Sequence, residues 1–166
     1  MSTLVDVELL TPDDWQRLRE IRLRALKESP LAFGGKLEEE KLKSETAWRE
    51  RYEIEDYLVA SISGEDVGML YIEVLEGDHG ATCWIGGCWS DPQYRGKGIM
   101  RALFDFIDVN AIKKGWQRQG LGVYVDNEIA TKTYEALGFS FIGEQFPSVD
   151  RPGRFFTHMV RNSPIN

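Results

Sequence analysis

A strand-like run, a pair of glycines and a helical pattern follow one another in the middle of the chain, and this junction constrains the fold most. Ala81–Cys88 reads as a strand, and apolar residues three and four apart from Ile99 onward predict a helix. Gly96 and Gly98 lie between them. A strand that turns through glycines into a helix presents unpaired backbone N–H groups and the positive end of the helix dipole. The junction therefore predicts an anion site, most naturally for phosphate.

The side chains around the two glycines fit this interpretation without proving it. Arg95 and Lys97 add positive charge, and glycine lets the backbone approach a ligand closely. An ordinary glycine turn with two solvated cations stays an open alternative. The Walker A pattern does not occur, and the third glycine of the dinucleotide fingerprint is replaced by Arg101.

The remaining pattern, Gln93-x-x-Gly96-x-Gly98, resembles the pyrophosphate-binding signature of the GNAT superfamily of N-acetyltransferases. The Asp91-Pro92 pair before it and Ile99 after it also fit that family. A departure is Met100, where a glycine or another small residue is frequent.

A second pattern that resembles the same family follows in the expected order. It reads Asn127-x-x-Ala130-x-x-x-Tyr134-x-x-x-Gly138-Phe139. Ala130 and Tyr134 are four apart and share one helical face. Taken alone, Asn127 reads as a helix N-cap and Tyr134 as a packing tyrosine; behind the glycine loop, functional roles become favoured.

The order of predicted elements is a strand, two helices, three antiparallel strands, a helix, a strand, a helix and two strands. This order coincides with the GNAT fold, an α+β (α/β mixed) three-layer fold. Its central sheet is twisted and mostly antiparallel, with about six to seven strands and helices on both faces. One domain over residues 1–166 is expected. The predicted strands are Val5–Leu10, Tyr57–Ile62, Val67–Val74, Ala81–Cys88, Leu121–Val125, Phe139–Gly143 and Phe155–Val160.

The predicted helices have recognisable starts and stops. The first begins at Thr11-Pro12, carries an apolar stripe that includes Ile21 with Arg22, and ends near Ser29-Pro30. The others are Ser44–Tyr52, Gly98–Lys114 and a helix opened by Asp126–Ala130 that runs to Leu137. The charged run Lys36–Lys43 is interpreted as solvated surface, and Gln145–Arg154 as part of a long irregular loop.

The resemblance implies direct transfer of an acetyl group from acetyl-CoA to a primary amine of a small molecule or peptide. The pantetheine arm is expected to lie where the fourth and fifth strands splay. Tyr134 is implied as the hydrogen-bond donor to the departing CoA thiolate. The implied acetyl-CoA-binding residues are Trp89, Ser90, Gln93, Arg95, Gly96, Lys97, Gly98, Ile99, Met100, Asn127 and Ala130.

The sequence does not identify which residue acts as the general base. Glu73 is the first candidate, and Asp91, Asp126 and His79 are others. Each could equally be a solvated surface charge, and a water relay would serve as well. Many family members place a glutamate in the fourth strand, where this chain has no acid.

The acceptor side is expected at Pro30–Gly35, whose Pro-x-Ala-Phe-Gly wording resembles the loop through which acceptors enter in many GNAT proteins. Phe33 and Gly34 are the candidate substrate residues. The alternative is that Phe33 simply anchors the loop to the core.

Composition limits the partners. The net charge of −7 and the isoelectric point near 4.9 argue against nucleic acid. No apolar run spans a membrane and no secretory signal is visible, so a cytoplasmic protein is expected. No metal is expected, and a homodimer is possible because the family often dimerises. Two alternatives stay open: a non-catalytic acyl-CoA-binding or sensor module, and an adaptor that uses an exposed Trp48 or the Phe155-Phe156 pair.

Overall fold

The computed structural model describes residues 4–164. Its contacts divide the chain into two compact units. Unit 1 comprises Met1–Glu73 with Gly87–Phe106, and unit 2 comprises Val74–Gly86 with Ile107–Asn166. The single domain expected over residues 1–166 stays a prediction.

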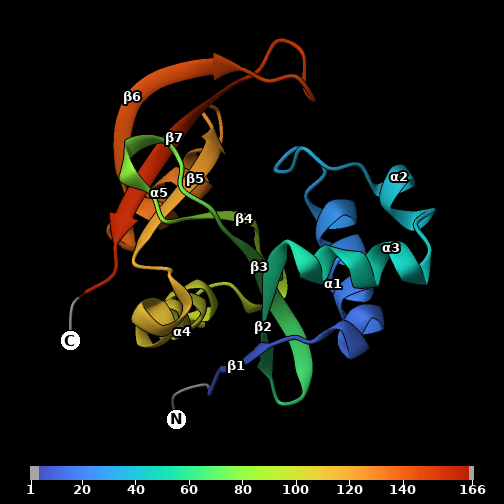
Figure 1. Ribbon diagram of the computed structural model, residues 1–166. Coiled ribbons are helices and arrows are strands. Elements are labelled where there is room, and N and C mark those ends of the chain that lie inside the picture. Colours follow the sequence, from blue (N-terminus) through green and yellow to red (C-terminus); the bar gives the residue numbers. More distant parts are fainter. Residues whose placement is uncertain (1–3, 165–166) are drawn as a thin grey trace. The chain divides into compact units, whose positions relative to one another are not determined.

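Unit 1 combines three antiparallel strands with three helices. Helices α1, α2 and α3 lie together beside the β2–β3 hairpin (Figure 1). The strands are β1 (Asp6–Leu9), β2 (Glu55–Ile62) and β3 (Glu65–Val74), and the helices are α1 (Trp15–Glu28), α2 (Leu37–Lys41) and α3 (Glu45–Glu50). The unit also holds the end of β4 (Cys83–Ser90) and the start of α4 (Ile99–Lys114).

The boundaries of α1 follow from its sequence. The backbone N–H of Thr11 donates to Asp14 Oδ2 at 2.9 Å, at a 3-10 turn that leads into the helix. The buried stripe consists of Leu18, Ile21, Arg22, Ala25 and Leu26. Ser29 precedes a proline and leaves the helical conformation, with ψ 63°. The predicted helix is thereby confirmed, and one charged residue is carried into its buried face.

The hairpin of unit 1 contains an irregularity that decides which residues face each other. Next to the turn, Ser61 pairs with Asp66, but after a shift beside Ala60 the pairs are Tyr57 with Tyr71 and Glu55 with Glu73. These side chains alternate with those of the opposite face. Tyr57 packs in the core cluster that contains α1 residues, and Tyr71 packs against that cluster. Glu55 and Glu73 therefore lie on the α1 side of the hairpin.

Unit 2 contains the other strands and a short helix. They are β5 (Arg118–Tyr124), α5 (Glu128–Ala136), β6 (Ser140–Pro147) and β7 (Phe155–Asn162). Strand β7 pairs antiparallel with both β5 and β6, and the start of β4 pairs parallel with β5 through Cys83–Ile85. The strand order is β1-β2-β3-β4-β5-β7-β6. A mixed α/β fold with a seven-stranded, mostly antiparallel sheet is thus confirmed.

Four expectations were wrong in detail. Lys36–Lys43 is not all solvated surface, because it contains α2, whose Glu40 is 7% exposed and ion-paired with Arg51. The element order therefore has one more helix than expected. Strand β6 continues to Pro147, into the segment expected to be irregular. Trp48 is fully buried, which removes it as an exposed adaptor residue.

Two further findings concern membrane-spanning helices and metal-binding clusters. Among residues 4–164, no helix is both long and apolar enough to cross a membrane. The same residues contain no group of three or more His, Cys, Asp or Glu side chains placed to hold a metal ion.

Candidate functional site

The glycine loop of unit 1 has the conformation that the sequence pattern predicts. Gly96 and Gly98 have φ of 79° and 78°, in the left-handed region that favours glycine. A Cβ built on either glycine meets no described atom within 4 Å, so the space beside both is open. Helix α4 starts at once, with the Ala102 N–H donating to the Gly98 carbonyl at 2.9 Å. The preceding N–H groups of the first turn lack such partners within the helix, so they can bind an anion.

Two contacts hold this loop against β3. The backbone N–H of Asp91 donates to the Val67 carbonyl at 2.7 Å. Ile99 is buried, and its side chain lies over Gly68, where a built Cβ would be only 2.4 Å from the Ile99 methyl carbon. A larger residue at position 68 would displace the start of α4. The predicted residues Gln93, Arg95 and Lys97 are exposed on the loop, and Ser90 and Met100 are half-buried.

A cavity with basic, acidic and aromatic side chains lies next to the start of the loop. A cavity of about 340 Å³ is lined by Arg24, Lys27, Glu28, Trp89, Asp91 and Pro92. The buried Trp89 donates its indole N–H to Glu28 Oε2 at 2.8 Å, and Arg24 lies over the indole ring at 5.4 Å. Arg95 lies 4.0 Å from the Glu28 carboxylate. These contacts fix Trp89, while Lys97 stays solvent-exposed on the loop.

A polar cluster lies on the α1 side of the hairpin, and we call it the Arg22 cluster. It consists of Arg22, Phe33, Glu55, Tyr57, Tyr71 and Glu73. Arg22 lies over the Phe33 ring at 5.1 Å, and Phe33 is buried in the core. The rings of Tyr57 and Tyr71 are 6.1 Å apart. The structure thus brings the predicted residues Phe33 and Glu73 to one face, and Phe33 anchors its loop as the alternative expected.

Glu55 has a carboxyl group whose pKa departs from its usual value. Burial raises the pKa of Glu55, and the charge of Glu73 raises it further. Tyr57 donates its hydroxyl to Glu55 Oε2 at 2.5 Å, and this bond acts in the opposite direction on the same pKa. A carboxylate with a raised pKa is better matched to accepting a proton near neutral pH.

The second motif lies in unit 2. Asn127 caps α5, because its side-chain oxygen accepts from the Ala130 N–H at 3.2 Å. Tyr134 is half-buried, and its ring meets Phe139 edge-on with centroids 5.7 Å apart. The capping expected of Asn127 is confirmed. Its contact with pantetheine, and the role of Tyr134 toward a thiolate, stay predictions.

The other candidate bases are engaged elsewhere. Asp91 accepts from the Gln93 N–H at 3.0 Å and pairs with Arg24 at 2.7 Å. Asp126 bonds to Arg154, which lowers the pKa of that carboxyl. His79 is exposed, and its ring lies 6.2 Å from that of His158. These surroundings favour Glu55 and Glu73 over all three as proton acceptors.

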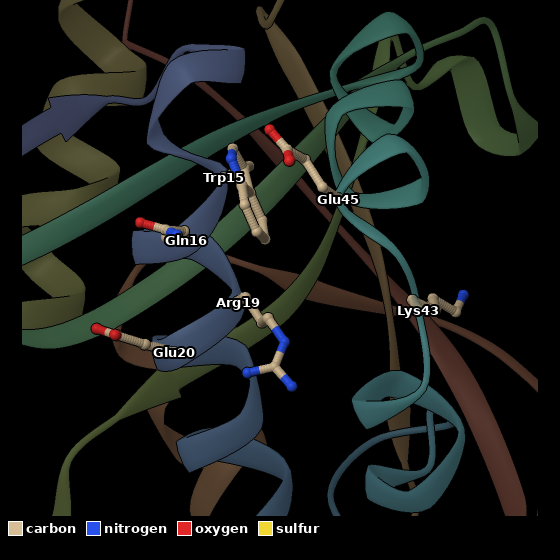
Figure 2. Close-up of a pocket in the computed structure, with 6 residues that line it drawn as sticks. All are labelled: Trp15, Gln16, Arg19, Glu20, Lys43 and Glu45. Atoms are coloured by element: carbon tan, nitrogen blue, oxygen red, sulfur yellow. The ribbon is translucent and has the colours of Figure 1, made fainter.

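A further cavity, of about 350 Å³, contains none of the predicted site residues. It lies between α1 and the segment that joins α2 to α3 (Figure 2). Its lining is Trp15, Gln16, Arg19, Glu20, Lys43 and Glu45. Its Arg19, a half-buried residue of the same helix as Arg22 and no member of the Arg22 cluster, provides a matched control arginine.

The sequence reasoning missed Glu55, Tyr57 and Tyr71, and treated Arg22 only as part of a helical stripe. A charged residue inside an otherwise apolar stripe was the available signal for Arg22. Glu55 gave less signal, because the expected strand began two residues after it.

Comparisons with known proteins agree with the fold, and the region matched by a family model contains both motifs. The model of the acetyltransferase (GNAT) family matches residues 15–139. The structure of a GNAT-family acetyltransferase from Streptococcus pneumoniae is similar with a TM-score of 0.77 and 15% identity, covering 97% of this chain and 100% of that one.

Two further similar structures are of proteins with a bound cofactor or a named acceptor. The putative acetyltransferase yncA from Salmonella typhimurium, solved with acetyl-CoA, has a TM-score of 0.73 and 18% identity, covering 98% of this chain and 95% of that one. The ribosomal-protein-S18-alanine N-acetyltransferase from Escherichia coli has a TM-score of 0.67 and 19% identity, covering 98% of this chain and 99% of that one. The family match spans most of the chain and both motifs, so this protein belongs to the GNAT family of acetyltransferases and is an enzyme of that family.

Proposed function

We propose that this enzyme transfers the acetyl group of acetyl-CoA directly to a primary amine of a small molecule or peptide. The observation that carries the proposal is the glycine loop, with left-handed Gly96 and Gly98, open space beside both, and a helix start immediately behind. Such a loop suits the CoA pyrophosphate. Acetyl-CoA in the similar Salmonella structure supports the choice of donor.

Each part of the loop has a proposed task. Backbone N–H groups at Gly98, Ile99 and Met100 bind phosphate oxygens, and Gln93, Arg95 and Lys97 bind them from the side. Backbone groups of Trp89 and Ser90 pair with the pantetheine arm, and the ordered indole of Trp89 keeps that part of β4 in place. Asn127 and Ala130, at the start of α5, contact the same substrate.

The departing thiolate needs a hydrogen-bond donor, and Tyr134 is proposed for it. A thiol pKa near ~8.5 and a tyrosine pKa near ~10 make full proton transfer uphill by roughly 2 kcal/mol. Tyr134 therefore acts as a donor that stabilises negative charge rather than as a full acid.

The acceptor must lose a proton before it attacks. At pH 7 an alkyl amine with pKa ~10.4 is neutral in only about one molecule in 2,500. Glu73 is retained as a proton acceptor, and its partner Glu55 joins it because burial raises the Glu55 pKa. We assign the base role to this pair, on the face that also carries Phe33.

Turnover is the experiment that tests the proposal. Acetyl-CoA is incubated with the protein and a broad panel of amines, and release of free CoA is followed together with the acetylated product. The proposal predicts amine-dependent CoA release. Binding of acetyl-CoA without turnover on the whole panel would instead support a non-catalytic acyl-CoA-binding module.

A further inference from the structure

Among residues 4–164, two arginines are buried, and their hydrogen bonding differs. Arg161, 6% exposed, donates to Asp108 through both terminal nitrogens at 2.7 and 2.8 Å, and to the Leu137 carbonyl at 2.7 Å. Arg22 is 9% exposed, and among residues 4–164 its Nη1 has no hydrogen-bond partner. The Arg22 guanidinium lies over the face of the Phe33 ring. Arg161 is thus fully hydrogen-bonded and structural, whereas the buried Nη1 of Arg22 has a hydrogen to donate and no acceptor among the described residues.

An unused buried donor on a charged group is unfavourable for folding. The carboxylate with the largest effect on Arg22 is that of Glu40, which is itself bonded to Arg51. Burial lowers the pKa of Arg22, in keeping with this incomplete solvation. A buried donor that costs stability without a partner suits a group whose hydrogen-bond partner belongs to a bound ligand.

The unused nitrogen points toward β4. A Cβ built on Gly87 would lie 3.4 Å from Arg22 Nη1 and 3.0 Å from the Tyr71 ring. Gly87 has φ of 62°, and its lack of a side chain lets Arg22 and the Tyr71 ring approach the backbone of β4 closely. It precedes Trp89 by two residues, on the strand proposed to hold the pantetheine arm. An anionic group bound by Arg22 therefore lies next to the segment where the acceptor amine must meet the thioester.

The opposite charge is close by on the same face. Glu55 and Glu73 both act on Tyr71 electrostatically, as Arg22 does. A site with one unpaired buried cation and two neighbouring carboxylates complements a molecule that carries a carboxylate and an ammonium group near each other. A simple diamine or a lysine side chain leaves the cation unused.

We propose that the acceptor is an α-amino acid, whose carboxylate is bound by Arg22 and whose amine lies on the side of Glu55 and Glu73. This inference rests on the proposed function and narrows its substrate class. A guanidinium and a carboxylate form paired, charge-assisted hydrogen bonds, which gives both affinity and orientation.

The test compares each of the twenty α-amino acids with the amine left by removing its carboxylate, for example phenylalanine with phenethylamine. Binding is measured by thermal shift at millimolar concentration, and kcat/KM by CoA release. At least one amino acid is expected to bind, and to exceed its matched amine at least tenfold in kcat/KM. Acetyl-CoA binding without any amino-acid binding would overturn this inference and leave the proposed function standing. Absence of acetyl-CoA binding would overturn the proposed function itself.

Arg22→Met then tests the assigned residue. It is expected to reduce the ratio of kcat/KM for amino acid over matched amine at least tenfold, and Arg22→Lys is expected to recover part of that ratio. The ratio is taken within one preparation, so a partly unfolded sample does not alter it. Arg19→Met, on the solvent-facing cavity of α1, serves as the control with an unchanged ratio. An unchanged ratio in both Arg22→Met and Arg22→Lys would refute the assignment.

Discussion

Glu55 and Glu73 are direct partners across the β2–β3 ladder, on the hairpin face that packs toward α1, where the charge of Arg22 also acts on Glu55. Partial burial raises the pKa of the half-buried Glu55, and the negative charge of Glu73 raises it further. We expect Glu55→Gln to lower kcat about 100-fold and Glu73→Gln to lower it less, as general-base losses do. Glu53→Gln, at an exposed neighbour, serves as the control. Equal activity of wild type and both variants would exclude the pair as base.

The same pair predicts a pH dependence. Activity needs Glu55 deprotonated, so it falls as pH drops through a pKa above the ordinary value near ~4.3. The raised pKa also means that Glu55 adds stability below its ordinary pKa, and this is lost as pH rises through the folded-state pKa. Glu55→Gln should therefore remove the acidic limb of the rate profile without lowering the melting temperature at pH 7. Persistence of that limb in Glu55→Gln would assign it to another group.

Tyr134→Phe separates chemistry from binding. The hydroxyl is proposed to donate to the thiolate only as it departs, so we expect transfer to slow at least tenfold while acetyl-CoA affinity hardly changes. Tyr124→Phe, which removes another hydroxyl of unit 2, bonded to Ser148, is the matched control. Single-turnover rates and calorimetric affinities check both. A normal rate would remove Tyr134 from the mechanism.

The Arg161 network predicts where unit 2 is most sensitive. Asp108 bonds to both terminal nitrogens of Arg161 and accepts from Ser163 at 2.7 Å. Asp108→Ala leaves the buried guanidinium without its charge partner, so we expect a loss of about 3 kcal/mol in the free energy of unfolding. Denaturant titration measures it, with Asp105→Ala at an exposed position of α4 as the control. Equal losses in the two variants would argue against a dominant role for the network.

His158 predicts an acid sensitivity of unit 2. Burial lowers its pKa, and the nearby His79 lowers it further, against a smaller opposite effect of Asp78. The unfolded chain then binds a proton more readily, so stability falls as pH drops below about 6.5. Its ring packs among Trp84, Phe146 and Phe156, and His158→Phe should flatten this dependence. Denaturant unfolding at several pH values tests this, and an unchanged slope would assign the sensitivity elsewhere.

Local patterns predicted much of this fold for physical reasons. The glycine loop, the Asn127 cap and the end of α1 at Ser29-Pro30 depend on neighbours in the chain, so residue types determine them. The prediction that the charged run Lys36–Lys43 is solvated was wrong, because the burial of Glu40 depends on its ion pair with Arg51, which lies outside that run.

The pairing of Glu55 with Glu73 could not be predicted from the sequence for a similar reason. Counting outward from the Ser63-Gly64 turn places Glu55 opposite Ile72. The shift beside Ala60 moves it opposite Glu73 instead. A bulge of this kind adds one residue to a strand and has no sequence signature of its own here. Arg22 was visible on its stripe, but its missing partner could be recognised only from the packed structure.

The most direct test of the account is calorimetric titration of acetyl-CoA into the wild-type protein and into the double variant Arg95→Glu/Lys97→Glu. Both side chains are exposed on the glycine loop, so reversing their charge should leave the fold intact. We expect micromolar binding to the wild type and at least tenfold weaker binding to the variant. Equal affinity in the two proteins, or no binding to either, would contradict the assignment of this loop to the CoA pyrophosphate.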